Sequence, residues 1–141
     1  MQGNDVGLIW APAGPGWPST GENWHEAQQV CQHLSEDGLT TAPASQHIWR
    51  LPTVDEAVRS MARHGQNSGG VWDAEIAKAT YKTTPDKESP LWNVYSQVIY
   101  WWTATEVDEE HAYIIVYDGK VWPRAKQFSP AYLGFRCVKQ P

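Results

Sequence analysis

Apolar residues recur every three or four positions in two stretches of this 141-residue chain, which is the spacing of one face of an α-helix. The first stretch predicts a helix over residues 24–35, whose inner face comprises Trp24, Ala27, Cys31 and Leu34. The second predicts a helix over residues 54–63, whose inner face comprises Ala57, Val58, Met61 and Ala62. Both helices begin with a capping box, formed by Asn23 with Glu26 and by Thr53 with Glu56.

The last third of the chain is β-branched and aromatic, and it predicts strands over residues 98–105, 112–117, 120–126 and 132–139. Asp118-Gly119 separates the second strand from the third, and this dipeptide predicts a tight hairpin because both residues tolerate positive φ. Helices followed by strands indicate an α+β fold, which we expect to form one domain over residues 1–141.

In two segments the apolar residues recur at no regular spacing. Residues 1–22 predict a short strand at residues 8–10 and then a loop rich in Gly and Pro. Residues 66–97 predict a long irregular loop, in which residues 73–79 are a candidate short helix. Loops of this length within a compact domain are uncommon and are often functional.

Composition narrows the class of partner. The net charge of −5 argues against nucleic acid and anionic membranes, since both require clustered Lys and Arg. No run of 18 apolar residues is present, so we expect no membrane insertion by this domain. The first residues lack the pattern of a secretory signal, and we expect a mature fragment in preference to a cytosolic protein. Nine Trp residues are unusual, and we expect most in the core and some on a ligand-binding face.

Four segments in this order resemble the C-type lectin-like fold. They are Trp24-x-x-Ala27-x-x-x-Cys31, Trp49-Arg50-Leu51-Pro52-Thr53-x-x-Glu56, Tyr100-Trp101-Trp102-Thr103-Ala104-Thr105-Glu106 and Gly134-Phe135-Arg136-Cys137-Val138. The combination is most similar to the C-terminal domain family of the Legionella collagen-like adhesin, a bacterial branch related to the formylglycine-generating enzyme group. The resemblance implies two N-terminal helices packed on a small antiparallel sheet, with a long irregular loop.

The resemblance also implies a disulfide between Cys31 and Cys137, and therefore a secreted or cell-surface protein. Both cysteines lie on faces predicted to point inward, which agrees with such a bond. Closing a loop of about a hundred residues would contribute about 4–5 kcal/mol in the chain-entropy model. Two separately buried thiols remain the alternative.

No catalytic motif is evident, and we expect no enzyme activity. The oxidases related to this family need a pair of reactive cysteines, whereas both cysteines here are assigned to the bridge. Iron-dependent relatives use a histidine-rich site, but the five His residues include no His-x-x-x-His pair. The calcium-binding triplets of sugar-binding C-type lectins are also absent. In particular, the Trp-Asn-Asp triplet is incomplete, since Trp92-Asn93 is followed by Val94 and not by Asp. We expect no cofactor, although the acidic loops leave structural calcium open.

In this fold the long loop and the last strands form the usual binding platform. The candidate ligand-binding residues are Trp92, Trp102, Glu106, His111, Tyr113, Lys120, Trp122 and Arg124. Strand alternation groups Lys120, Trp122 and Arg124, and together with Tyr113 and Tyr117 they predict a mixed aromatic and basic patch. Burial of Trp122 and Tyr113 in the core is the alternative.

The expected function is a non-enzymatic extracellular binding or adhesion module that recognises a glycan or a protein. The first alternative is a structural subunit of a larger surface assembly. A metal-dependent enzyme related to the oxidases is the second alternative, and it is the weaker of the two because no motif supports it.

Overall fold

The computed structural model describes residues 8–17, 19–86 and 98–141. Its elements in the first half of the chain are β1 (Ile9–Trp10), β2 (Ser19–Thr20), α1 (Trp24–His33), α2 (Val54–Arg59), β3 (Ala62–Arg63) and β4 (Gln66–Asn67). Those in the second half are β5 (Val71–Asp73), β6 (Lys78–Thr80), β7 (Tyr100–Glu106), β8 (His111–Val116), β9 (Val121–Ala125), β10 (Leu133–Phe135) and β11 (Val138–Lys139). The predicted α+β class is confirmed.

Both helices begin where the sequence predicts and end earlier. Each capping box is complete, with the side chains of Asn23 and Thr53 accepting from the backbone amide three residues on. Helix α1 ends because Leu34 is extended and bridges to Thr41. Helix α2 ends because the chain turns into the β3–β4 hairpin, where the Ser68 amide donates to the Met61 carbonyl.

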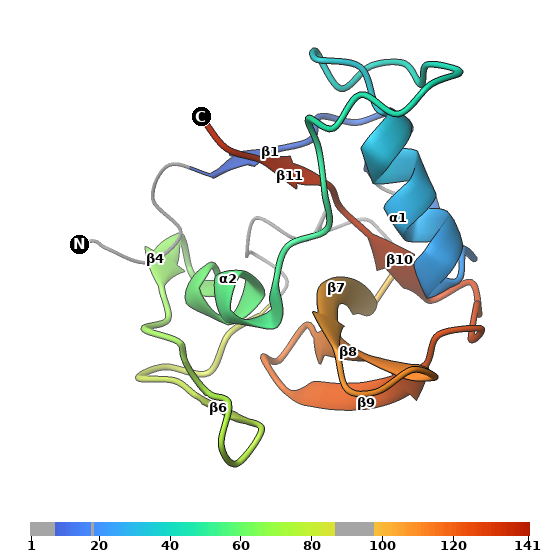
Figure 1. Cartoon of the computed structure of the whole chain (residues 1–141). Coiled ribbons are helices and arrows are strands. Elements are labelled where there is room, and N and C mark those ends of the chain that lie inside the picture. Colours follow the sequence, from blue (N-terminus) through green and yellow to red (C-terminus); the bar gives the residue numbers. More distant parts are fainter. Residues whose placement is uncertain (1–7, 18, 87–97) are drawn as a thin grey trace.

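A five-stranded sheet in the order β2-β10-β7-β8-β9 forms the centre of the fold (Figure 1). Strands β7, β8 and β9 form an antiparallel meander, but β10 runs parallel to β7. The sheet is therefore mixed, and the β10–β7 pairing is where it departs from the expected small antiparallel sheet. Since β9 and β7 run in the same direction, residues 126–132 must return along the sheet before β10 can pair with β7.

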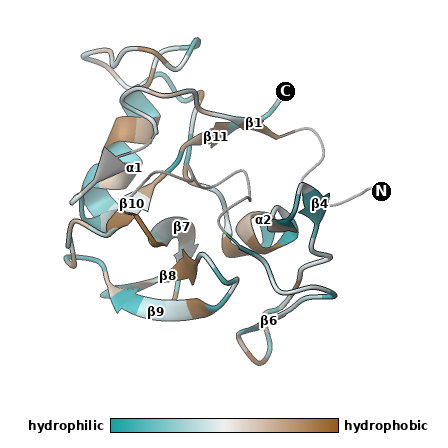
Figure 2. Ribbon diagram, turned by 180° about the vertical axis from the view of Figure 1, so that it is seen from behind, coloured by the Kyte–Doolittle hydropathy of each residue, from teal (hydrophilic) through white to brown (hydrophobic). Residues whose placement is uncertain are grey.

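Each face of the sheet carries its own hydrophobic cluster. Helix α1 packs with Trp102, Ile114, Phe135 and their neighbours on one face, which we call the α1 face. Helix α2 packs with Trp101, Ile115 and Val98 on the opposite face, the α2 face. Figure 2 shows brown on β8, which is covered on both faces, and a largely teal and white β9 at the edge.

The two ends of the described chain lie together. Strands β1 and β11 pair antiparallel, as Figure 1 shows, and Arg50 bridges to Val138 beside them. The Cys31 and Cys137 sulfurs are bonded at 2.11 Å, with Cα atoms 5.5 Å apart, and both residues are fully buried. The predicted disulfide is therefore confirmed, and it joins α1 to the segment between β10 and β11.

Arg136, beside the disulfide, stacks between two Trp rings. Its guanidinium carbon lies 4.0 Å from the ring centroid of Trp17 and 5.5 Å from that of Trp10, and its Nε donates to the Ala11 carbonyl at 3.0 Å. Burial lowers the pKa of Arg136 to about 10. The guanidinium thus fixes the N-terminal segment against the end of the sheet.

Residues 66–97 are not a continuous loop. Strands β3 and β4 form one short hairpin and β5 and β6 another, so the predicted helix over residues 73–79 is wrong. The β5–β6 hairpin packs on α2. Its residue Trp72 also makes an edge-to-face contact with Tyr113 of β8. Tyr81 then donates its hydroxyl to the Gly119 carbonyl at 2.6 Å, which ties this segment to the β8–β9 turn. Residues 87–97 lie outside the described part of the chain.

The Asp118-Gly119 hairpin forms with a different turn from the one predicted. Gly119 has a φ of +88°, whereas Asp118 does not have positive φ. The Gly119 amide donates to the Val116 carbonyl, and the Val116 amide donates to the Lys120 carbonyl. This pattern fits a three-residue loop with glycine in the left-handed position. Such a loop matches the twist of the two strands and needs positive φ at only one residue.

Candidate functional site

The eight candidate residues do not form one surface. Trp102 is 0% exposed, packs in the α1-face cluster and donates its indole N–H to the Glu22 carbonyl at 3.1 Å. Its predicted place on the binding surface is therefore wrong, because a ring with no exposed area cannot meet a ligand there. Trp92 lies outside the described residues.

The predicted aromatic and basic patch is divided between the two faces of the sheet. Residues directly opposite in neighbouring strands point to the same face. Trp122 lies opposite Ile114, which is in the α1-face cluster, whereas Tyr113 lies opposite Pro123 and packs on the α2-face cluster. Grouping Tyr113 with Trp122 was wrong because alternation within each strand does not give the register between them.

Four residues on the α1 face form the group that we call the aromatic face: the exposed Trp122 and Tyr132 and the half-buried Tyr100 and Arg124. Trp122 is 46% exposed and Tyr132 is 41% exposed. The Arg124 guanidinium carbon lies 5.9 Å from the Tyr100 ring centroid, and the rings of Tyr100 and Tyr132 meet edge to face at 5.3 Å. The half-buried Tyr100 thus holds both an exposed ring and a cation in place.

The remaining polar candidates make local interactions. Lys120 lies at the β8–β9 turn with its Nζ 3.9 Å from an Asp118 oxygen. His111 Nδ1 lies 2.9 Å from the Asp108 carboxylate in the acidic turn of residues 106–110. Hydrogen bonds from the His111 ring and the Glu110 amide hold the pKa of Asp108 below its usual range. His111 therefore stabilises the acidic turn through its contacts with Asp108.

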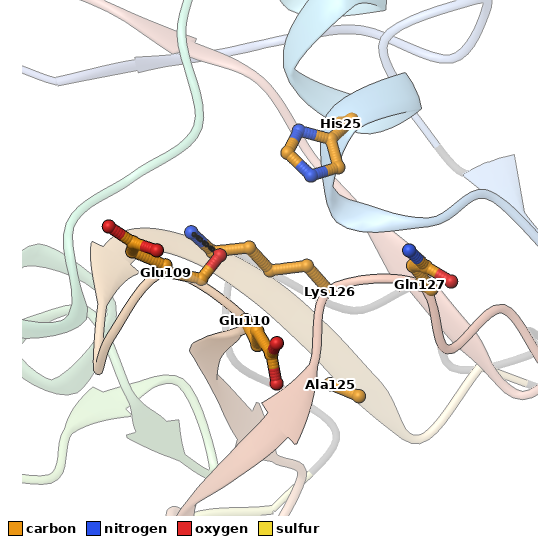
Figure 3. A pocket seen from close by; sticks show the side chains of 6 residues that line it. All are labelled: His25, Glu109, Glu110, Ala125, Lys126 and Gln127. Atoms are coloured by element: carbon orange, nitrogen blue, oxygen red, sulfur yellow. Dashed lines mark hydrogen bonds between the residues drawn. The ribbon is translucent and has the colours of Figure 1, made fainter.

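A pocket of about 360 Å³ opens where α1 begins and β9 ends, and we call it the polar pocket (Figure 3). Its lining residues are His25, Glu109, Glu110, Ala125, Lys126 and Gln127. His25 lies across the pocket from the two glutamates of the acidic turn. The side chains of Glu109, Glu110 and Gln127 have no hydrogen bond or ion pair within the described ranges, so they are available to a ligand.

Buried Lys126 forms the base of this region. Its Nζ donates to a Glu106 carboxylate oxygen at 2.6 Å and to the Glu109 carbonyl at 3.0 Å, and it lies 4.4 Å from the Trp24 ring centroid. Its amide donates to the Glu110 carbonyl, which extends the β8–β9 pairing by one step. Lys126 therefore ties the acidic turn to α1, and Glu106 neutralises its charge.

Two replacements of Lys126 separate the hydrogen bonds of its ammonium group from the packing of its apolar stem on Trp24. We expect Lys126→Ala to lower the free energy of unfolding by about 2 kcal/mol, because two hydrogen bonds from a charged donor are lost. Lys126→Met keeps the apolar stem over Trp24 and should lose less. Urea unfolding measures both, and equal stability of Lys126→Ala and the wild type would contradict this role.

Sequence reasoning missed half of the aromatic face and most of the polar pocket. Tyr100 could have been found, since strand alternation places it on the same face as Trp102. Tyr132 gave no signal because it follows a crossover whose path the sequence does not specify. His25 gave no signal, because Glu109, Glu110 and Lys126 in the pocket lie more than eighty positions away from it.

Comparison with protein-family models, curated proteins and solved structures finds no match for this chain. Within residues 8–17, 19–86 and 98–141, no group of three or more His, Cys, Asp or Glu side chains is placed to hold a metal ion. None of the helices in these ranges has the length and apolar character needed to cross a membrane.

Proposed function

We propose that this protein is a non-enzymatic binding module that recognises a glycan through the aromatic face. The observation that carries the proposal is the exposed Trp122 ring on β9, two residues before Arg124, whose guanidinium lies over the Tyr100 ring. An indole offers a flat apolar surface and a polar N–H, a combination suited to a sugar ring, which has an apolar face and hydroxyl edges. Arg124 supplies hydrogen-bond donors beside it.

The surroundings of Trp122 favour a glycan over a protein partner. Pro123 removes one backbone donor from the outer edge of β9, which disfavours a protein partner that would add a strand to this edge. Separate rings with polar groups between them suit the alternating apolar and hydroxyl surfaces of a sugar chain.

We further propose that the chain adopts a C-type lectin-like fold and works outside the cell. The support for the fold is the bond between the first helix and the last strands, together with the pairing of β1 with β11. A buried disulfide favours an oxidising compartment. The segment between α2 and β7 carries the hairpins β3–β4 and β5–β6, and β9 lies at the edge of the sheet, where a ligand can reach it.

The direct test is Trp122→Ala. We expect it to weaken binding to glycans found on an array at least tenfold, because stacking aromatic residues dominate binding surfaces. The melting temperature should change little, since nearly half of the side chain is exposed. Isothermal titration measures the affinity, and Ile76→Ala, at an exposed apolar residue between β5 and β6, is the control. Unchanged affinity of Trp122→Ala would refute the proposal.

A further inference from the structure

Basic side chains flank the exposed indole of the aromatic face along its own strand. Lys120, Trp122, Arg124 and Lys126 occupy alternate positions on β9 and at its two ends. Backbone hydrogen bonds of Lys120 and Lys126 continue the pairing with β8 past both ends of β9, so the alternation places all four side chains on the α1 face. This edge strand therefore carries a row of three cations, with the Trp122 ring between the first two.

The two lysines of this row differ in how far their charge is neutralised. Lys126 is buried, and its Nζ donates to a Glu106 carboxylate oxygen at 2.6 Å. The Lys120 Nζ lies 3.9 Å from an Asp118 oxygen, and the Lys120 side chain is 67% exposed, so this contact contributes little. Lys120 can therefore meet a ligand with most of its charge, whereas Lys126 cannot.

Arg124, the third cation of the row, has no counterion among the described residues. Its guanidinium lies over the Tyr100 ring and donates once, to the Pro123 carbonyl at 2.9 Å, so most of the N–H donors of the group remain. Contact with the ring also limits the motion of the guanidinium, which lowers the entropy lost when it binds an anion. Arg124 is thus a positioned positive charge beside the surface that we assign to a sugar.

The acidic turn of residues 106–110 gives an anionic ligand its direction along the strand. Glu109 and Glu110 line the polar pocket together with Ala125, so an anionic chain that left Arg124 on that side would meet like charge. The other direction leads past Trp122 to Lys120, which is four positions from Arg124, or about 13 Å along an extended strand. A ligand with negative charge at both cations and a ring over Trp122 is therefore longer than one sugar.

We propose that the aromatic face selects an oligosaccharide of acidic sugars that carry carboxylates, and that Arg124 determines this specificity. This inference rests on the proposed glycan function of the same surface. A sugar carboxylate accepts two parallel hydrogen bonds from the Arg124 guanidinium, a charge-assisted geometry that a lysine does not reproduce. A ring of the chain stacks on Trp122, and a further acidic unit reaches Lys120.

Two matched probes test the preference for charge: α-1,4-linked tetragalacturonate and its full methyl ester. They share one backbone and differ only in whether the carboxyl groups are charged. Titration calorimetry at neutral pH should show the acid binding about tenfold tighter than the ester, as one hydrogen bond between charged groups implies. Added salt should weaken the acid and reduce this preference. Equal binding of the two probes, or binding of neither, overturns the acidic-sugar inference alone.

Substitutions of Arg124 test whether this residue is the source of the preference. Arg124→Gln removes the charge and keeps a hydrogen-bond donor, and it should reduce the preference to about twofold. Lys78→Gln is the matched control, because it removes the same charge from an exposed residue of β6, in the hairpin that packs on α2. It should keep the wild-type preference. A preference that survives Arg124→Gln, or that Lys78→Gln also abolishes, overturns the role of Arg124.

Two further titrations separate this inference from the function on which it rests. Trp122→Ala should weaken the acid and the ester alike, and binding that is unaffected by this substitution overturns both proposals. Tetraglutamate carries carboxylates on a peptide backbone, and it should bind more weakly than tetragalacturonate, because it has no sugar ring to stack on Trp122 and Pro123 disfavours an added strand. Tetraglutamate that binds as tightly as tetragalacturonate would show recognition of charge without a sugar, and it would overturn the inference.

Discussion

Replacing Cys31 and Cys137 together with Ala is expected to lower the free energy of unfolding by about 4–5 kcal/mol. The bond closes a loop with a sequence separation of 106, so its loss returns a large conformational entropy to the unfolded chain. Both residues are fully buried, and the small side chains that replace them add a modest packing loss. The melting temperature should fall by about 8–20 °C, at roughly 2–4 °C per kcal/mol for a chain of this size.

Urea unfolding with and without a reducing agent distinguishes the disulfide from local packing. Reductant added to the unfolded wild type should reproduce most of the loss, whereas it should not change the stability of the double variant. A loss below about 1 kcal/mol would mean that β1, β11 and the Arg136 stack hold the ends of the chain without the bond. The role that we assign to the disulfide would then be wrong.

Trp102→Ala is expected to cost about 3–5 kcal/mol of stability, the range for truncating a large aromatic residue in a core. Trp102 has no exposed area, and its indole N–H donates to the Glu22 carbonyl, so truncation leaves both a cavity and an acceptor without its donor. Trp102→Phe keeps most of the volume and should cost less.

Trp122→Ala is the matched comparison for Trp102→Ala. The two residues lie on the same face of the sheet, and each is opposite Ile114 on neighbouring strands. We expect a stability change below about 1 kcal/mol for Trp122, as for most partly exposed positions. Equal losses for the two variants in urea unfolding would show that Trp122 is part of the core.

The helices could be predicted from the sequence because their signals are local. The side chain of Asn23 and the Glu26 amide lie within one turn, so the capping box is visible in four residues. The disulfide was expected from the family resemblance, and the predicted inward faces of both cysteines agreed with it. The Asp118-Gly119 hairpin formed for the same reason of local turn chemistry.

The sheet and the site could not be predicted in the same way because they depend on register and crossover. Alternation placed Tyr113 and Trp122 together, whereas the pairing of Tyr113 with Pro123 separates them. The segment of residues 126–132 carries Tyr132 to Tyr100 and makes β10 parallel to β7, and no local pattern marks that path. The polar pocket likewise unites the start of α1 with the end of β9.

The most direct test of the account follows the indole N–H groups by NMR during a glycan titration, with the nine Trp residues labelled with ¹⁵N. We assign the Trp122 signal by its loss in Trp122→Ala. That signal should move in proportion to bound ligand, while the buried Trp102 signal should stay in place. If Trp122 remains still while the ligand binds, or if no oligosaccharide perturbs any indole, the aromatic face is not a glycan-binding surface.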